Sequence, residues 1–293
     1  MEKEQNIGRF LPRDWRLAHG RQITLGPTGH IMAIINVTPD SFSDGGAYFD
    51  PDAAIGHALS CVREGATILD IGGESTRPGG AAVSPDIEQA RVLPVVKRLA
   101  QETQALLSVD TYHASTAAAA IQAGAHIIND VSGLTHDPSI ATIVAATGAG
   151  LCVMHTGRNR RKLQDPLDDQ RSFFQSALAV AREAGVQDDQ ITLDPGFGFE
   201  KTDEEHIVLL DRLAELLDLG YPLLVGTSRK RFLGTLTGRA VEHRDTATAV
   251  TTALLRHAGA AIVRVHDVAG SLDALSVVDA MIAARARILR PCE

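Results

Sequence analysis

The sequence has few aromatic residues, few cysteines and no excess of positive charge. Phe, Trp and Tyr make up only 4% of its 293 residues, so the core has to be built from Ala, Val, Ile and Leu, within a hydrophobic total of 44%. Such a composition suits parallel strands that helices cover on both faces. The formal net charge of −8 argues against a nucleic-acid partner, because binding to a phosphate backbone needs a surplus of cations.

Neither a disulfide framework nor a zinc site is indicated. The three cysteines (Cys61, Cys152 and Cys292) are odd in number, and no pair has the spacing of metal ligands. The first ten residues, MEKEQNIGRF, lack the apolar stretch of a signal peptide, and no run of about 18 uncharged apolar residues is present that could span a membrane. We therefore expect a cytoplasmic protein that binds neither membranes nor nucleic acids.

Short apolar runs recur along the chain, and most are followed by a longer segment with helical spacing, such as 168–184 and 204–219. Strands that alternate with helices predict βαβ units and a parallel sheet. Eight such units in a chain of this length predict a (β/α)8 TIM barrel. The alternative is a doubly wound sheet, which would favour a glycine-rich turn after the first strand, where this chain has Asn-Val-Thr-Pro. The eight runs are 31–37, 67–71, 106–109, 126–128, 151–154, 191–193, 222–225 and 261–265.

The chain divides into a short extension and one large domain. Residues 1–30 precede the first barrel strand, and within them RQITLGPTGH has the pattern of a short hairpin that would close the bottom of the barrel. Residues 31–293 are predicted to form a single catalytic domain. Glycines in REGAT, QAGAH, REAGV, LDLGY and RHAGA precede strands, and each is able to end a helix in the left-handed conformation.

Polar residues follow the apolar runs, at the ends where barrel enzymes hold their active sites. Asp110, Asn129 and Asp194 are rich in hydrogen-bond acceptors, and together they suit a planar heterocycle with adjacent N–H and NH₂ donors. Other runs end at Asn36, in the segment GGESTRPGG, at His155, in GTSRKRFLG and in RVHD.

A cationic group is predicted on the same rim. Arg264 and His266 lie two apart on one strand, so their side chains share a face, and with Lys230 they form a patch suited to phosphate. Alternatively, RVHD provides an inward ion pair of the barrel. A second basic cluster, GRNRRK at residues 157–162, is expected to be solvated surface.

The first predicted strand runs into a polar segment, NVTPDSFSDGG, that is longer than a connection requires. Its short polar side chains and glycines give it little apolar anchorage, which predicts a mobile segment.

Seven motifs, in order over about residues 31–267, resemble the successive signatures of the dihydropteroate synthase family. They are IINVTPDSFSDGG, DIGGESTRPG, SVDTY, INDVSG, LDPGFGFEKT, GTSRKRFLG and IVRVHD. The resemblance implies a (β/α)8 folate-pathway transferase. It would condense 6-hydroxymethyl-7,8-dihydropterin pyrophosphate with p-aminobenzoate, use Mg²⁺, act as a homodimer and be inhibited by sulfonamides, which mimic p-aminobenzoate.

The resemblance also implies roles for individual residues. The pterin would be held by Asp110, Asn129, Asp194 and Lys230, with Met154 and Phe199 packed near it. Arg264 would stack on the ring and, with His266 and Asn36, hold the pyrophosphate; Asn36 would also reach Mg²⁺. The p-aminobenzoate site would be shaped by Phe42, Thr76 and Arg77, with Ser228 near the carboxylate. The polar segment after the first strand would then act as a lid that closes over the site, with Phe42 turning inward. The alternative is that Phe42 is a fixed core residue under a rigid turn.

The sequence departs from the family pattern in two places. Glu200 stands where glycine is frequent, and the fifth loop, MHTGRNRRKLQD, is longer and more basic than is common. Two alternatives to the synthase stay open. A pterin-binding methyltransferase barrel would share the Asp and Asn residues but has no need for Arg264 and His266. A non-catalytic paralogue would be expected to have lost residues of the rim.

Overall fold

A closed barrel of parallel strands forms the centre of the molecule. The computed structural model describes residues 9–38, 51–74 and 83–289 of the chain. The strands pair in the order β8-β7-β6-β5-β4-β3-β10-β9, and a parallel bridge between Leu193 and Leu223 joins the two ends of this sheet. The predicted TIM barrel is therefore confirmed. Its strands are β3 His30–Asn36, β4 Ile68–Gly72, β5 Leu106–Asp110, β6 Ile127–Asp130, β7 Gly150–Met154, β8 Ile191–Asp194, β9 Leu224–Val225 and β10 Ile262–Val265.

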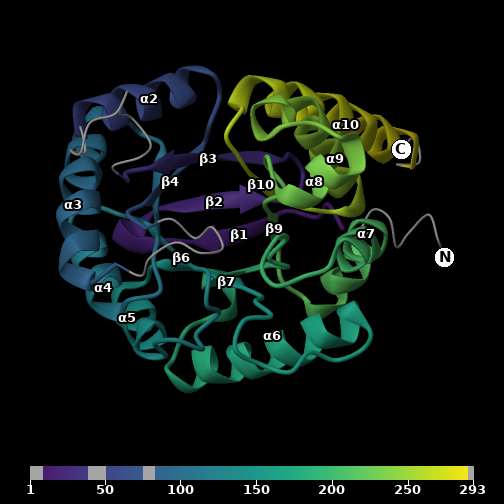
Figure 1. The fold of residues 1–293 in the computed structure, drawn as a ribbon. Helices are drawn as coiled ribbons and strands as arrows, with labels where there is room; N and C mark the ends of the chain where they lie inside the picture. The colour runs from purple at the N-terminus through teal and green to yellow at the C-terminus, as the bar shows by residue number, and fades with distance from the viewer. Residues whose placement is uncertain (1–8, 39–50, 75–82, 290–293) are drawn as a thin grey trace.

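Helices surround the barrel (Figure 1). The two predicted helical segments are present, the first as α6 Pro166–Glu183 and the second as α7 Asp203–Arg212 followed by the 3-10 helix η4 Leu213–Leu219. The glycines expected to end helices all have positive φ values, between 87° and 114°. Within the described ranges, no helix is long and apolar enough to cross a membrane. The helices are α2 Pro51–Arg63, α3 Pro85–Glu102, α4 Ala114–Gln122, α5 Ser139–Thr147, α6 Pro166–Glu183, α7 Asp203–Arg212, α8 Arg231–Thr237, α9 Asp245–Ala258 and α10 Val268–Leu289.

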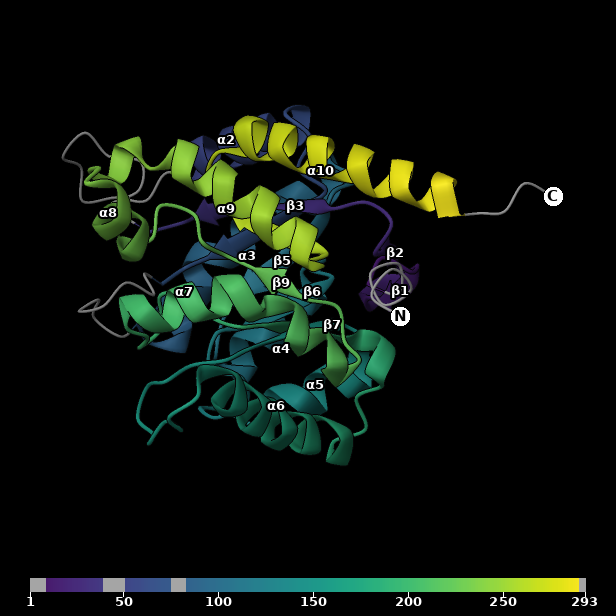
Figure 2. The same cartoon turned by 90° about the vertical axis from the view of Figure 1, so that its right-hand side faces the viewer.

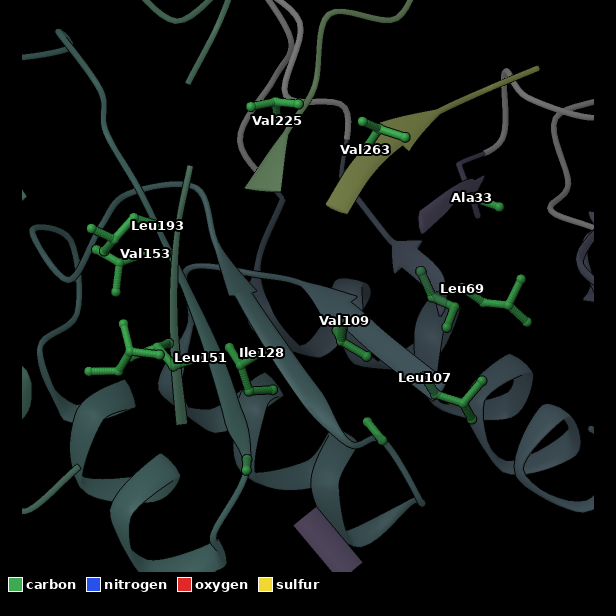
Figure 3. Packing of buried hydrophobic residues seen from close by; sticks show 14 of the residues in the cluster. Ala33, Leu69, Leu107, Val109, Ile128, Leu151, Val153, Leu193, Val225 and Val263 are labelled. Carbon is green, nitrogen blue, oxygen red and sulfur yellow. The ribbon is translucent and has the colours of Figure 1, made fainter. Parts of the chain in front are cut away.

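The strands place alternate side chains on opposite faces, which separates two hydrophobic clusters. The larger cluster lies between the strands and the helices, and Figure 3 shows members of it such as Leu69, Val109 and Ile128. The smaller cluster includes Met32, Ile68 and other residues from the early part of several strands. Further along the same strands, the side chains that also point into the barrel interior are mostly polar. One end of the barrel is therefore apolar, and the other end carries the polar groups.

A two-stranded hairpin at the apolar end belongs to the smaller cluster. It pairs β1 Arg13–Arg16 with β2 Gln22–Leu25, and Figure 2 shows it at the end of the barrel opposite α8. Trp15 is 1% exposed, and its Nε1 donates to the Gln190 carbonyl over 2.7 Å. The hairpin thus contributes to the barrel core. The sequence placed it within residues 21–30, but its first strand lies earlier, and Gly26 to Gly29 instead lead into β3.

Candidate active site

The predicted site residues that the structure describes gather at the polar end of the barrel. Asp110, Met154 and Asp194 are the last residues of β5, β7 and β8, and Asn36 ends β3. Phe42, Thr76 and Arg77 lie outside the described residues, as does the loop predicted to act as a lid. The remaining predicted residues lie in β6 and β10 or just beyond β8, β9 and β10: Asn129, Phe199, Ser228, Lys230, Arg264 and His266.

Asp70, which sequence reasoning did not select, lies at the centre of the polar end. It has no exposed surface. One carboxylate oxygen accepts from Arg264 Nε over 2.6 Å and from Asn129 Nδ2 over 3.1 Å, and the other accepts from Ser108 Oγ over 2.6 Å. Asp70 therefore links β4 to β5, β6 and β10 across the barrel interior.

Arg264 forms an inward ion pair with two carboxylates. Its Nη2 also donates to Asp110 Oδ2 over 2.9 Å. The alternative reading of RVHD is therefore the arrangement observed, and the positive charge of Arg264 is balanced by Asp70 and Asp110. Burial raises the pKa of Asp110 to about 7; the negative charge of Asp70 adds to this rise, and Arg264 opposes it. Burial and the ion pair with Arg264 thus act on Asp110 in opposite directions.

Asn129 holds a buried acceptor ready for a ligand. Its Nδ2 is fixed by donation to Asp70, so the orientation of the side-chain amide follows from the network. Its Oδ1 is buried and has no hydrogen-bond partner among the residues that the structure describes. Leaving such a group unpaired costs about 1–3 kcal/mol. A donor on a bound molecule would remove that cost.

Asp194 and Lys230 lie near enough to each other that the charge of each affects the ionisation of the other. Burial raises the pKa of Asp194, and the charge of Lys230 opposes this. Burial lowers the pKa of Lys230 to about 8, with Asp194 again acting in the opposite direction. Lys230 Nζ donates to the Phe197 carbonyl and lies 4.6 Å from the centroid of the Phe199 ring. The contacts of Lys230 with Phe197 and Phe199 therefore connect the loop after β9 to the loop after β8.

Two glycines allow the loop after β8 to pass through this crowded region. Gly196 has φ of 65°, and a Cβ there would lie 1.9 Å from the carbonyl oxygen of His155. Gly198 has φ of 85°, and its Cβ would lie 2.7 Å from Lys230 Cδ. The motif GFGF is thus explained by close packing and by left-handed backbone, which glycine tolerates without strain.

Ser228 and His266 meet just beyond the ends of β9 and β10. Ser228 Oγ lies 2.9 Å from His266 Nδ1 and accepts from the backbone N–H of His266 over 3.1 Å. A hydroxyl that accepts from this N–H is able to donate to Nδ1, which favours the imidazole tautomer with its proton on Nε2. The predicted phosphate patch is therefore built from partnered groups: Arg264 on carboxylates and His266 on Ser228.

Behind the rim lies a second polar cluster that the sequence did not reveal. Lys201 Nζ donates to the Gly196 carbonyl over 2.8 Å and lies 2.9 Å from His155 Nδ1. His155 Nε2 in turn lies 2.9 Å from Asp169 Oδ2 on α6. Burial lowers the pKa of Lys201 to about 7 and that of His155 to about 4. His155 was expected at the rim. It instead lies behind the rim and, through Lys201, supports the loop after β8.

The basic cluster at residues 157–162 is not simply solvated surface. Arg160 pairs with Asp169, and Lys162 Nζ lies 2.7 Å from Glu205 Oε2. Arg158 Cζ lies 5.0 Å from the centroid of the Phe199 ring, and within the cluster Arg161 is exposed, as expected. The expectation is therefore wrong for Arg158, Arg160 and Lys162, because acidic and aromatic partners lie on neighbouring elements.

Taken together, the polar end of the barrel combines buried acceptors with cations and an aromatic ring. Asp110, Asn129 and Asp194 present oxygens at the ends of three strands. Lys230 and Arg264 supply positive charge beside them. Such a site suits a flat molecule that donates several hydrogen bonds and carries an anionic group.

Comparison with known proteins identifies relatives over most of the chain. Residues 32–266 match the family model described as "Pterin binding enzyme". The dihydropteroate synthase of Bacillus subtilis is 45% identical over 252 residues, which cover 86% of this chain and 88% of that protein.

Solved structures agree with this similarity. The dihydropteroate synthase of Clostridium difficile, solved in the presence of pteroic acid, superposes with a TM-score of 0.85 at 44% identity, covering 88% of this chain and 98% of that one. The Xanthomonas albilineans enzyme, solved with 4-aminobenzoic acid, gives a TM-score of 0.87 at 42% identity, covering 92% and 99%.

Proposed function

The chain belongs to the dihydropteroate synthase family, and from this membership and the site we infer that it joins 6-hydroxymethyl-7,8-dihydropterin pyrophosphate to p-aminobenzoate. The amine nitrogen bonds to the methylene carbon of the pterin, the bond from that carbon to the pyrophosphate oxygen breaks, and the nitrogen loses a proton. The products are 7,8-dihydropteroate and pyrophosphate. The observation that carries this proposal is the buried Oδ1 of Asn129, which has no partner in the described part of the chain and lies near the strand ends that carry Asp110 and Asp194.

These three residues are proposed to hold the pterin head. An aminopyrimidinone offers adjacent N–H and NH₂ donors, which a carboxylate accepts two at a time. Burial raises the pKa of Asp194, and hydrogen bonds from such donors would favour its ionised form. Lys230, Met154 and Phe199 complete the pocket, Met154 through its place beside Asp194 in the strand register.

Arg264 and His266 are proposed to receive the pyrophosphate. The bonds of Arg264 to Asp70 and Asp110 use Nε and Nη2, and a guanidinium has five N–H donors, so others are available to a phosphate oxygen. The flat guanidinium is also able to stack on the pterin. His266 would offer Nε2–H to the same anion. Cations placed where negative charge develops favour departure of the leaving group.

Mg²⁺ fits the site as an ion that arrives with the substrate. Among the parts of the chain that the structure describes, no group of three His, Cys, Asp or Glu side chains could hold a metal alone. Mg²⁺ commonly binds through one or two protein oxygens together with substrate phosphates and water. The half-buried Asn36 at the end of β3 would supply such an oxygen. When bound, the ion would help to neutralise the leaving pyrophosphate.

The p-aminobenzoate site is proposed around Ser228, at the mouth beside Lys230. Ser228 is 6% exposed and already shares its hydroxyl with His266, so it links the two substrate positions. Phe42, Thr76 and Arg77 stay predicted contributors to this site. The proposal also includes a cytoplasmic location, supported by the free thiols of Cys61 and Cys152, which suit a reducing compartment.

A homodimer is proposed through the outer faces of α9 and α10, which pack side by side (Figure 1). Each of these helices exposes an apolar pair at i, i+4 spacing: Val250 and Leu254, and Val277 and Met281. Apolar patches of this kind mark protein contacts. Leu254→Glu should convert the dimer to a monomer in light-scattering measurements. The control Ile87→Glu, on α3, should leave the dimer intact.

Pyrophosphate release tests the reaction. We expect release that depends on both the pterin pyrophosphate and p-aminobenzoate, with a sulfonamide competing against the latter. Release that is independent of p-aminobenzoate would contradict the synthase assignment. Pterin binding without any release would indicate a non-catalytic paralogue, and methyl transfer to a corrinoid protein would indicate the methyltransferase alternative.

A further inference from the structure

We propose that Arg158 and Lys162 are positioning residues that hold Phe199 in place and thereby set the affinity for the pterin substrate. Both belong to the basic loop, residues 157–162, which follows β7. Phe199 lies in the loop that follows β8. The inference rests on the proposed function in one respect, the assignment of Phe199 to the pterin pocket.

The ring of Phe199 is held by cations from two neighbouring loops. Arg158 Cζ lies 5.0 Å from the ring centroid, and Lys230 Nζ lies 4.6 Å from the same centroid. The face of an aromatic ring attracts cations, and a guanidinium also packs flat against it. Phe199 is half-buried. The two cations on its ring therefore restrict the orientation of this side chain.

The backbone beside Phe199 is held by Lys162. The next residue, Glu200, has φ of 51°, a left-handed conformation that side chains other than glycine adopt at a cost. Lys162 Nζ donates to the Glu200 carbonyl over 2.8 Å and to the two oxygens of Glu205 over 2.8 and 2.7 Å. Glu205 also accepts from the N–H of Thr202, at the start of α7. Lys162 thus ties the strained turn to a helix N-terminus.

The basic loop is itself anchored. Arg160 Nε donates to the Thr156 carbonyl over 2.7 Å, and Arg160 Nη1 donates to Asp169 Oδ1 over 2.9 Å. Asp169 is 3% exposed, and although burial works against its ionisation, hydrogen bonds from His155 and Arg160 hold its pKa well below the usual range. Arg158 and Lys162 therefore act from a fixed base. The two departures from the family pattern, Glu200 and the basic loop, contact each other directly.

The test compares three variants of the basic loop that each lose one charge. Arg158→Gln and Lys162→Gln remove the proposed contacts, and Arg161→Gln removes an exposed charge from the same loop. Calorimetry gives the dissociation constant for the pterin pyrophosphate, and steady-state kinetics separate KM from kcat. Arg158→Gln should weaken binding about fivefold, the range of a partly exposed cation–π contact, with kcat within about twofold of the unmodified protein. Arg161→Gln should change neither quantity.

A double-mutant cycle separates positioning from direct contact with the anionic substrate. If Arg158 acts through the ring, Arg158→Gln should have no further effect once Phe199→Ala is present. An equal loss in both backgrounds would overturn the proposal and indicate that Arg158 touches the substrate. The proposal would also be overturned if Arg158→Gln and Arg161→Gln had the same dissociation constant for the pterin pyrophosphate. Arg158→Lys, which keeps the charge, serves as the second variant if Arg158→Gln does not fold, and it should retain more than half of the affinity.

The role of Lys162 has its own rescue experiment. If Lys162 holds Glu200 in the left-handed conformation, Glu200→Gly should restore most of the affinity that Lys162→Gln loses, because glycine adopts this backbone without strain. Absence of rescue would overturn this part of the proposal. Calorimetry does not require turnover, so a protein that binds the pterin without releasing pyrophosphate would refute the proposed reaction while these cycles still decide the inference. A protein that fails to bind the pterin would overturn both.

Discussion

Replacing Asp70 by Asn should destabilise the barrel and disorder the pterin pocket together. The substitution keeps the size of the side chain and removes its charge. Asp70 accepts from Arg264, Asn129 and Ser108 with no exposed surface. The introduced amide has one oxygen, which would face Arg264 and Asn129, and its NH₂ group would face the Ser108 hydroxyl. The main loss is therefore the ion pair.

Breaking a buried ion pair by removing one partner costs about 3–5 kcal/mol. Asp110 still accepts from Arg264 Nη2, so part of the guanidinium charge stays balanced, and the lower end of this range, about 3 kcal/mol, is expected. Unfolding entropy is about 2.1 cal/mol/K for each residue, so in a chain of 293 residues that loss lowers the melting temperature by about 5 °C. Binding of the pterin should also weaken, because Asp70 orients both Arg264 and Asn129.

The assay is thermal and urea-induced unfolding of Asp70→Asn beside Ser108→Ala, with calorimetry for the pterin. Ser108→Ala removes one hydrogen bond to the same carboxylate without changing charge, and should cost about 1 kcal/mol. If Asp70→Asn proves no less stable than Ser108→Ala, and binds the pterin normally, then Asp70 does not organise the site as argued.

Three further predictions concern other parts of the site and the fold. Asp194→Ala should weaken pterin pyrophosphate binding by about 1–3 kcal/mol for each donor left unpaired, and unchanged affinity in calorimetry would remove Asp194 from the pocket. Burial lowers the pKa of Lys230 to about 8, so this ammonium loses its proton as the pH rises, and kcat/KM should fall above about pH 8. Lys230→Arg, which stays charged, should move that fall to higher pH; an unmoved profile would assign it to another group. Trp15→Ala should cost about 3–5 kcal/mol in urea unfolding, because the hairpin fills the barrel end, and a loss below about 1 kcal/mol would show the hairpin to be peripheral.

The barrel and its polar rim follow from local patterns in the sequence. Each strand is a short apolar run, and several of the helices between the strands are followed by a glycine in the left-handed conformation, such as Gly65 or Gly259. Since the ends of parallel strands meet at one rim, Asp110, Asn129 and Asp194 could be brought together without knowledge of distances. The chemistry of their acceptors then indicated the class of ligand.

Asp70 was not predicted as a site residue because it lies inside an apolar run, between Leu69 and Ile71. The prediction used only the residues at the ends of the runs. The strand period offers a signal, since Asp70 shares its face with Ile68, which belongs to the cluster in the barrel interior. Its partner, Arg264, is separated from it by 194 positions in the sequence. A pairing of this kind depends on closure of the barrel, which no local pattern encodes.

The hairpin and the cluster behind the rim were hard to predict for different reasons. The strand Arg13–Arg16 has one buried residue, Trp15, among exposed ones, so its apolar pattern is too short to recognise. His155, Lys201 and Asp169 come from the ends of two loops and from a helix, and each alone reads as a surface or rim residue. Only their packing around the Gly196 turn makes them a support for the site.

The site buries several charged groups. Asp70 and Asp110 share Arg264, and burial works against the charged forms of Asp194 and Lys230, while the charge of each favours the ionised form of the other. An interior of this kind is less stable than an apolar one of the same shape. A ligand that donates to Asp194, Asp110 and Asn129 Oδ1 would add hydrogen bonds to these buried acceptors, and Asn129 Oδ1 has no other partner among the residues that the structure describes. The groups that bind the substrate therefore also stabilise the folded protein when the substrate is bound. Substrate binding thus offsets the free-energy cost of burying these polar groups.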